Sequence, residues 1–152
     1  MNVLKKQKAS FFIYLMVLLL TTSLLFLYLS NVNKPYYQDM RLDVIFLLVG
    51  TLAMILLTLG ISLFSKAKRL YFVADISRVM AVLLIILGGV TFISMRLESF
   101  GYIFGSNLEM GNDAAFDAGT QAIMIIILFM VTWLIAVIAA FFDIGQKNSV
   151  AE

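Results

Sequence analysis

Residues 121–142 read QAIMIIILFMVTWLIAVIAAFF and contain no Asp, Glu, Lys or Arg. In an α-helix that rises 1.5 Å per residue, such a run reaches about 33 Å, enough to cross the hydrocarbon core of a bilayer at roughly 30 Å. Its apolar residues do not alternate with polar ones, as they would in a strand of a membrane barrel. The stretch therefore predicts a membrane-spanning helix.

Three further runs without charged residues precede this stretch. The third of them, 79–95, is short, so we expect its helix to begin earlier, between Leu70 and Asp75, with Arg78 extending its charged end to the lipid headgroups. The fold predicted is an all-α membrane protein in which 1–152 form a single four-helix transmembrane bundle. The expected spans are about 10–29, 44–64, 75–96 and 120–142.

The first run follows three lysines, Lys5, Lys6 and Lys8, as the apolar part of a signal peptide would. It covers about 20 residues, however, whereas the apolar part of a signal peptide covers ~7–15. The residues 29–33 that come after it also lack a small-x-small cleavage pattern. We therefore expect the first run to remain in the protein as a helix.

The composition of the whole chain agrees with a lipid environment. Of the 152 residues, 62% are hydrophobic and only 13% are charged, against about 45–50% and 25% in soluble domains. Cysteine and histidine are absent, which excludes disulfides, ordinary zinc sites, His-ligated haem and nucleophiles activated by His. We expect no cofactor, and a net charge of +2 gives no indication of nucleic-acid binding.

Basic residues divide unevenly between the two sides of the predicted bundle. The side of the outer loops, 30–43 and 97–119, carries only Lys34, Arg41 and Arg96. The other side includes both termini and the inner loop 65–74. Its eight basic residues are Lys5, Lys6, Lys8, Lys66, Lys68, Arg69, Arg78 and Lys147. Because basic loops stay in the cytoplasm, we expect both termini to be cytoplasmic, and the compact loops suit a bacterial cytoplasmic membrane.

The second outer loop, 97–119, is the longest and most polar connection. Gly111 and Asn112 resemble a turn followed by a helix N-cap, with Asp113 in the first turn, where the helix dipole favours negative charge. If the fourth helix begins there, Asp113, Asp117 and Gln121 lie on one face.

A candidate polar site therefore consists of Arg96, Glu109, Asp113 and Asp117. Three interpretations stay open. The acidic face is a solvated helix start; or Arg96 and Arg41 pair with Asp113 or Asp117 and lock the helices together; or Glu109, Asp113 and Asp117 bind a cation through their oxygens.

Small residues recur every four positions along the last helix. Such ladders let membrane helices approach closely. They predict packing either within the bundle or against another membrane protein or a second copy. The candidate packing residues are Ala114, Ala118, Ala122, Thr132, Ala136 and Ala140.

No Asp, Glu, Lys or Arg falls inside the four uncharged runs, although such residues in a membrane span usually mark proton relays and substrate paths. We therefore expect a non-enzymatic membrane protein, most simply an accessory or structural subunit of a larger membrane or transport complex. One alternative is a sensor or ligand binder that uses the acidic outer loop. A second alternative is an oligomeric transporter or channel lined by hydroxyl groups. The hydroxyl residues concerned are Thr21, Thr22, Ser23, Thr51, Thr58, Ser62 and Thr91.

Overall fold

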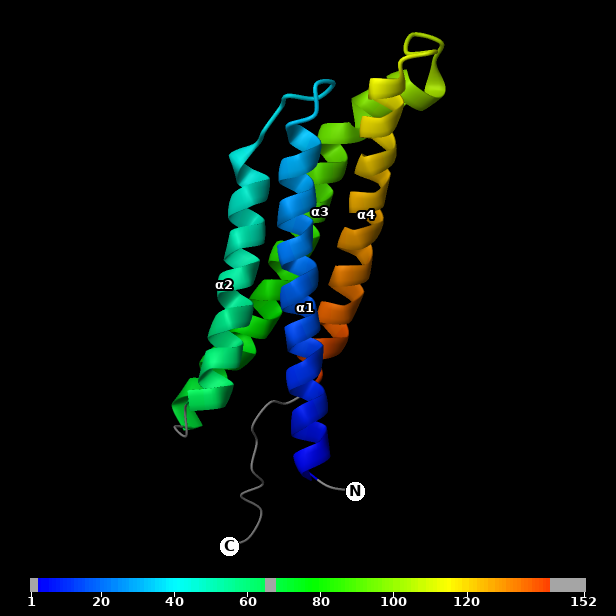
Figure 1. The fold of residues 1–152 in the computed structure, drawn as a ribbon. Helices are drawn as coiled ribbons and strands as arrows, with labels where there is room; N and C mark the ends of the chain where they lie inside the picture. The colour runs from blue at the N-terminus through cyan, green and yellow to red at the C-terminus, as the bar shows by residue number, and fades with distance from the viewer. Residues whose placement is uncertain (1–2, 65–67, 143–152) are drawn as a thin grey trace, which may run out of the picture.

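The computed structural model describes residues 3–64 and 68–142, which form four helices and their connections (Figure 1). All four helices are long and apolar enough to cross a membrane, as predicted. The helices are α1 (Val3–Val32), α2 (Leu42–Phe64), α3 (Lys68–Gly105) and α4 (Asp113–Ala140). Part of the expected inner loop, 65–67, and the carboxyl-terminal segment 143–152 lie outside the described residues.

Each helix packs against two neighbours, so that α1, α2, α3 and α4 form a ring in chain order. α1 begins and α4 ends at the same end of the bundle (Figure 1). Two hydrogen bonds join these helices there: the Ser10 hydroxyl donates to the Phe142 carbonyl at 3.3 Å, and the Tyr14 hydroxyl to the Ala139 carbonyl at 2.8 Å. Which side of a membrane this end faces stays a prediction from the distribution of basic residues.

Buried residues recur at alternating intervals of three and four along α4. This is the spacing of a heptad repeat, in which side chains interlock with those of neighbouring helices that cross at about 20°. In α4 this series is Ala115, Ala118, Ala122, Ile125, Phe129, Thr132, Ala136 and Ala139, and Gly119 beside it is buried as well. In α1 the corresponding series is Val17, Thr21, Leu24, Tyr28 and Asn31. Large apolar side chains on the opposite faces, such as Leu19 and Leu134, are exposed and available to lipid.

Two polar layers close the ends of this apolar interior, and α3 contributes an arginine to each. Arg78 and Arg96 are eighteen positions apart, which is about 27 Å along a helix and close to the thickness of a hydrocarbon core. Arg78 donates to the carboxylate of Asp75, three residues earlier, at 2.9 Å. Its guanidinium lies 5.8 Å from the centre of the Tyr14 ring and the residue is buried, so it packs against α1 instead of extending away from the bundle.

The long helix α3 differs most from expectation. It continues to Gly105, so residues 97–105 of the expected second outer loop are helical. Its apolar part, Leu70–Gly105, contains 36 residues, about 54 Å of helix, which exceeds the 40–45 Å of a bilayer with its headgroup regions.

The hairpin of residues 97–119 consequently reaches beyond the connection between α1 and α2 (Figure 1). We call it the outer prong, after the side predicted from the basic residues.

Candidate functional site

The predicted site residue Arg96 lies at the centre of the polar layer nearer the outer prong, and its side chain has no exposed surface. Its two terminal nitrogens donate to the two carboxylate oxygens of Asp39, at 2.5 and 3.1 Å. Its Nε donates to the Asn31 side-chain oxygen at 3.2 Å. This two-pronged contact suits the planar guanidinium group, and a buried arginine requires such a partner to compensate for lost hydration. Arg96 thus joins α3 to α1 and to the first outer loop.

The amide groups of Asn31 and Gln121 extend this network to α4. Asn31 donates to the Ala118 carbonyl and to the Gln121 side-chain oxygen, both at 3.1 Å. Gln121 in turn donates to the Ser30 hydroxyl at 3.3 Å. We call Asn31, Asp39, Arg96 and Gln121 the outer cluster.

Two aromatic rings lie close to the Arg96 guanidinium group. Its carbon lies 3.6 Å from the centre of the Tyr37 ring and 5.4 Å from that of Phe92. Burial raises the pKa of Tyr37, and the charge of Arg96 offsets part of this rise. The Tyr37 hydroxyl is buried without a hydrogen-bond partner among the described residues. Tyr37 therefore acts on Arg96 through its ring and not through its hydroxyl.

Further contacts fasten the first outer loop to its surroundings. Lys34 forms an ion pair with Asp117 of α4. The Tyr36 hydroxyl donates to the Glu109 carboxylate at 3.4 Å, and desolvation together with this carboxylate raises the pKa of Tyr36. These contacts hold the first outer loop against the outer prong.

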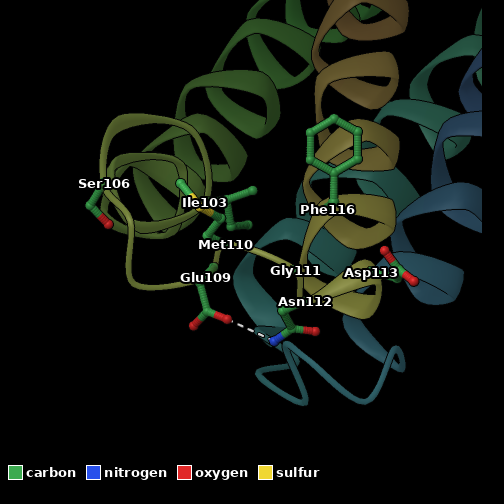
Figure 2. Close-up of a pocket in the computed structure, with 8 residues that line it drawn as sticks. All are labelled: Ile103, Ser106, Glu109, Met110, Gly111, Asn112, Asp113 and Phe116. Atoms are coloured by element: carbon green, nitrogen blue, oxygen red, sulfur yellow. Dashed lines mark hydrogen bonds between the residues drawn. The ribbon is translucent and has the colours of Figure 1, made fainter.

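The turn at the tip of the outer prong is built as the sequence predicts. Gly111 has a φ of +85°, a conformation that glycine adopts without strain. Asn112 is the N-cap of α4, and its side chain accepts a hydrogen bond from the Ala115 N–H at 3.2 Å. Its amide donates to the Glu109 carboxylate at 2.7 Å, which closes the turn (Figure 2).

A shallow hollow of about 300 Å³ lies beside this turn (Figure 2). This volume is at the lower limit of ligand pockets, which measure roughly 300–1,000 Å³. The residues that line the hollow are Ile103, Ser106, Glu109, Met110, Gly111, Asn112, Asp113 and Phe116.

The four predicted site residues do not form one site. Arg96 pairs with Asp39 and not with Asp113 or Asp117, and Arg41 pairs with Asp43 at 2.8 Å. The expected lock between helices is thus present, but with other partners, because the first outer loop folds across the bundle and places Asp39 over Arg96. Among the described residues, no three acidic side chains come together as a metal site would require.

The predicted packing residues are placed unequally. Ala118, Ala122, Thr132 and Ala136 are buried in the interface between helices. Ala114 is exposed and Ala140 is half-buried, because the heptad spacing follows Ala115 and Ala139 in their place. A strict four-residue ladder drifts around the helix, whereas alternating steps of three and four keep to one face.

Six of the seven hydroxyl groups expected to line a pore bond to their own helices. Thr21, Thr51 and Thr58 each donate to the carbonyl four residues earlier, at 2.8–2.9 Å. Thr22, Ser23 and Thr91 do the same at 2.8–3.0 Å. Of these six, Thr22 and Ser23 point away from the bundle interior. Within one chain these hydroxyl groups therefore do not share one face of the bundle.

The sequence interpretation missed Asn31, Asp39 and Tyr37 as partners of Arg96. A usable signal was present: Asn31 is an amide at the end of an apolar run, and Asp39 follows it by eight positions. The pairing itself depends on how the first outer loop folds back, which local sequence patterns do not specify.

Comparisons of the chain with protein-family models, with curated proteins and with solved structures find no match in any of the three.

Proposed function

We propose that this chain is a small, non-enzymatic subunit of a larger complex in a bacterial cytoplasmic membrane, with both termini in the cytoplasm. The observation that carries the proposal is the exposed apolar surface of the outer prong. At its tip, Leu108 and Met110 are 74% and 77% exposed. Exposed apolar surface outside lipid is typical of sites that contact other proteins.

The arrangement of the outer cluster supports a structural role for the polar interior. The donors of Arg96 already engage Asp39 and Asn31, and the side chain has no exposed surface. A group held in this way stabilises the positions of helices, whereas catalysis requires a group that can reach a substrate. Two alternatives, a channel and a small-ligand sensor, have less support because the hydroxyl groups bond to their own helices and the hollow is small.

Extraction of the chain from its native membrane at its normal level of expression tests the proposal. The membranes are cross-linked before mild detergent extraction, and the mass of the species that carries the chain is measured by native electrophoresis. We expect a species much larger than the 17.0 kDa chain, with one membrane protein present in constant ratio. Tagging that protein should recover the chain in the same ratio.

A chain that runs as a monomer, or only with copies of itself, in two different detergents would contradict the proposal. The transport alternative has a separate test, in which purified protein is reconstituted in liposomes and ion flux is compared with that of empty liposomes. Flux that depends on the protein would favour the channel over the subunit.

A further inference from the structure

The outer prong combines exposed apolar side chains with charge of one sign. Six large apolar residues are 44–77% exposed: Leu97, Tyr102, Phe104, Leu108, Met110 and Phe116. Its charged residues are Glu98, Glu109, Asp113 and Asp117, and no Lys or Arg occurs between 97 and 119. Lys34 neutralises only Asp117, at the base. The tip is therefore both apolar and acidic.

This combination of apolar surface and negative charge distinguishes between the molecules that could bind the tip of the outer prong. Anionic lipid headgroups attract basic segments, and the prong has no basic residue with which to bind them. Two prongs packed together would oppose acidic residues on both sides, and like charges across an interface cost several kcal/mol. A segment that carries basic and apolar residues together complements the surface in both respects.

The hollow beside the turn can accommodate one basic side chain of such a segment. Met110 and Phe116 provide apolar side chains, and Glu109 and Asp113, whose carboxylates point in different directions, are also among the lining residues (Figure 2). Lysine and arginine have an apolar stem and a charged end, which suits a hollow lined in this way. A charge-assisted hydrogen bond to a carboxylate would then fix the orientation of the segment.

We infer that the tip of the outer prong docks a basic, amphipathic segment of a partner protein on the outer side of the membrane. This inference rests on the proposed function and adds the surface and the chemistry of the partner. Leu108, Met110 and Phe116 supply the apolar contacts, and Glu109 and Asp113 supply the charge.

Photocrosslinking in the native membrane tests the inference. A benzophenone amino acid replaces Leu108 at the tip or, as a control, Met40 in the first outer loop, which is 55% exposed. The crosslinked segment is then sequenced by mass spectrometry. We expect the probe at Leu108, and not the probe at Met40, to capture one segment that is rich in Lys or Arg and in apolar residues.

Two pairs of variants measure the contributions of the tip, each with the probe at Leu108. Met110→Ser is compared with Met40→Ser, and Asp113→Asn with Asp43→Asn, since both aspartates lie in the first turn of a helix. We expect each tip variant to lower the crosslink yield about fivefold, as the loss of about 1 kcal/mol does, and the controls to leave it unchanged. Higher ionic strength should lower the yield of the unaltered tip, and immunoblots verify equal amounts of each variant in the membrane.

The inference is overturned if the probe at Leu108 captures lipid, a second copy, or a neutral or acidic segment. It is also overturned if the complex persists in native electrophoresis while the tip variants leave the crosslink yield unchanged. In both cases the proposed function stands, because the complex is detected independently. Absence of any complex in native electrophoresis refutes the proposed function itself.

Discussion

Arg96 shows how one charged side chain determines the arrangement at one end of the bundle. It has no exposed surface, yet it contacts a carboxylate, an amide and two aromatic rings from three parts of the chain. Removing a partner from a buried charge is strongly destabilising because the charge stays behind without compensation. Substituting a residue that contacts Arg96 should therefore lower the free energy of unfolding much more than substituting a nearby polar residue that does not.

Replacing Asp39 with Asn tests the ion pair directly. The variant keeps the shape of the side chain but removes the charge that faces Arg96, and we expect it to lower the free energy of unfolding by about 3 kcal/mol. The matched control is Asp43→Asn. The side chains of Asp43 and its partner Arg41 are both about half exposed, so we expect this variant to lower the free energy of unfolding by about 1 kcal/mol or less. Reversible unfolding by SDS in mixed micelles measures both. Equal losses would contradict the special position of Asp39.

Tyr37 allows the contribution of the ring to be separated from that of the hydroxyl. We expect Tyr37→Phe to keep the stability unchanged or to raise it by up to about 1 kcal/mol, because a buried hydroxyl without a partner is unfavourable. Tyr37→Ala removes the stacked ring and should cost about 2 kcal/mol. The same unfolding measurement applies. A large loss in Tyr37→Phe would show that the hydroxyl has a role that the present geometry does not predict.

The helices themselves depend on small residues where they approach closely. Gly119 of α4 faces α3, and a Cβ atom placed there would lie 3.0 Å from the Phe104 ring and 3.1 Å from Ile103. In the middle of the bundle, Gly88 and Gly89 similarly leave room for Phe129 at 3.4 Å. The base of the outer prong is thus packed closely, although its tip is exposed.

A comparison of two glycines in the outer prong tests this packing. Gly101→Ala introduces a Cβ with nothing within 4 Å, so the better helix propensity of alanine should stabilise by up to about 1 kcal/mol. Gly119→Ala gains the same propensity but forces Phe104 and Ile103 to move, and we expect a net loss of about 1–2 kcal/mol. Unfolding midpoints of the two variants give the difference. If both variants gain stability equally, α3 and α4 do not pack closely at the base of the prong.

At the scale of the whole molecule, the bundle has a defined thickness between its two polar layers. Arg78, Asp75 and Tyr14 mark one layer, and the outer cluster marks the other. Since about 27 Å of α3 separates Arg78 from Arg96, the apolar belt matches a bilayer. The outer prong then lies at one end of this apolar belt, and the start of α1 and the end of α4 lie at the other (Figure 1).

The absence of cysteine makes this topology straightforward to measure, because each introduced cysteine is a unique label. We expect Met110→Cys at the tip of the prong to react with a membrane-impermeant maleimide in intact cells. Ser149→Cys, near the carboxyl terminus, should react only after the membrane is permeabilised. The reverse pattern would invert the orientation, and labelling of both from outside would contradict four spans.

The sequence alone determined that the chain has four helices long and apolar enough to span a membrane, approximately where they lie, and that α4 begins with an Asn112 cap. These features depend on hydropathy, helix rise and capping chemistry, which act within one segment. It did not determine which face of each helix is buried, because a helix in lipid is apolar on both faces and gives no amphipathic signal. Only the tertiary structure placed Asp39 and Asn31 on Arg96, since this requires the first outer loop to fold over Arg96 of α3 and α1 to pack near it.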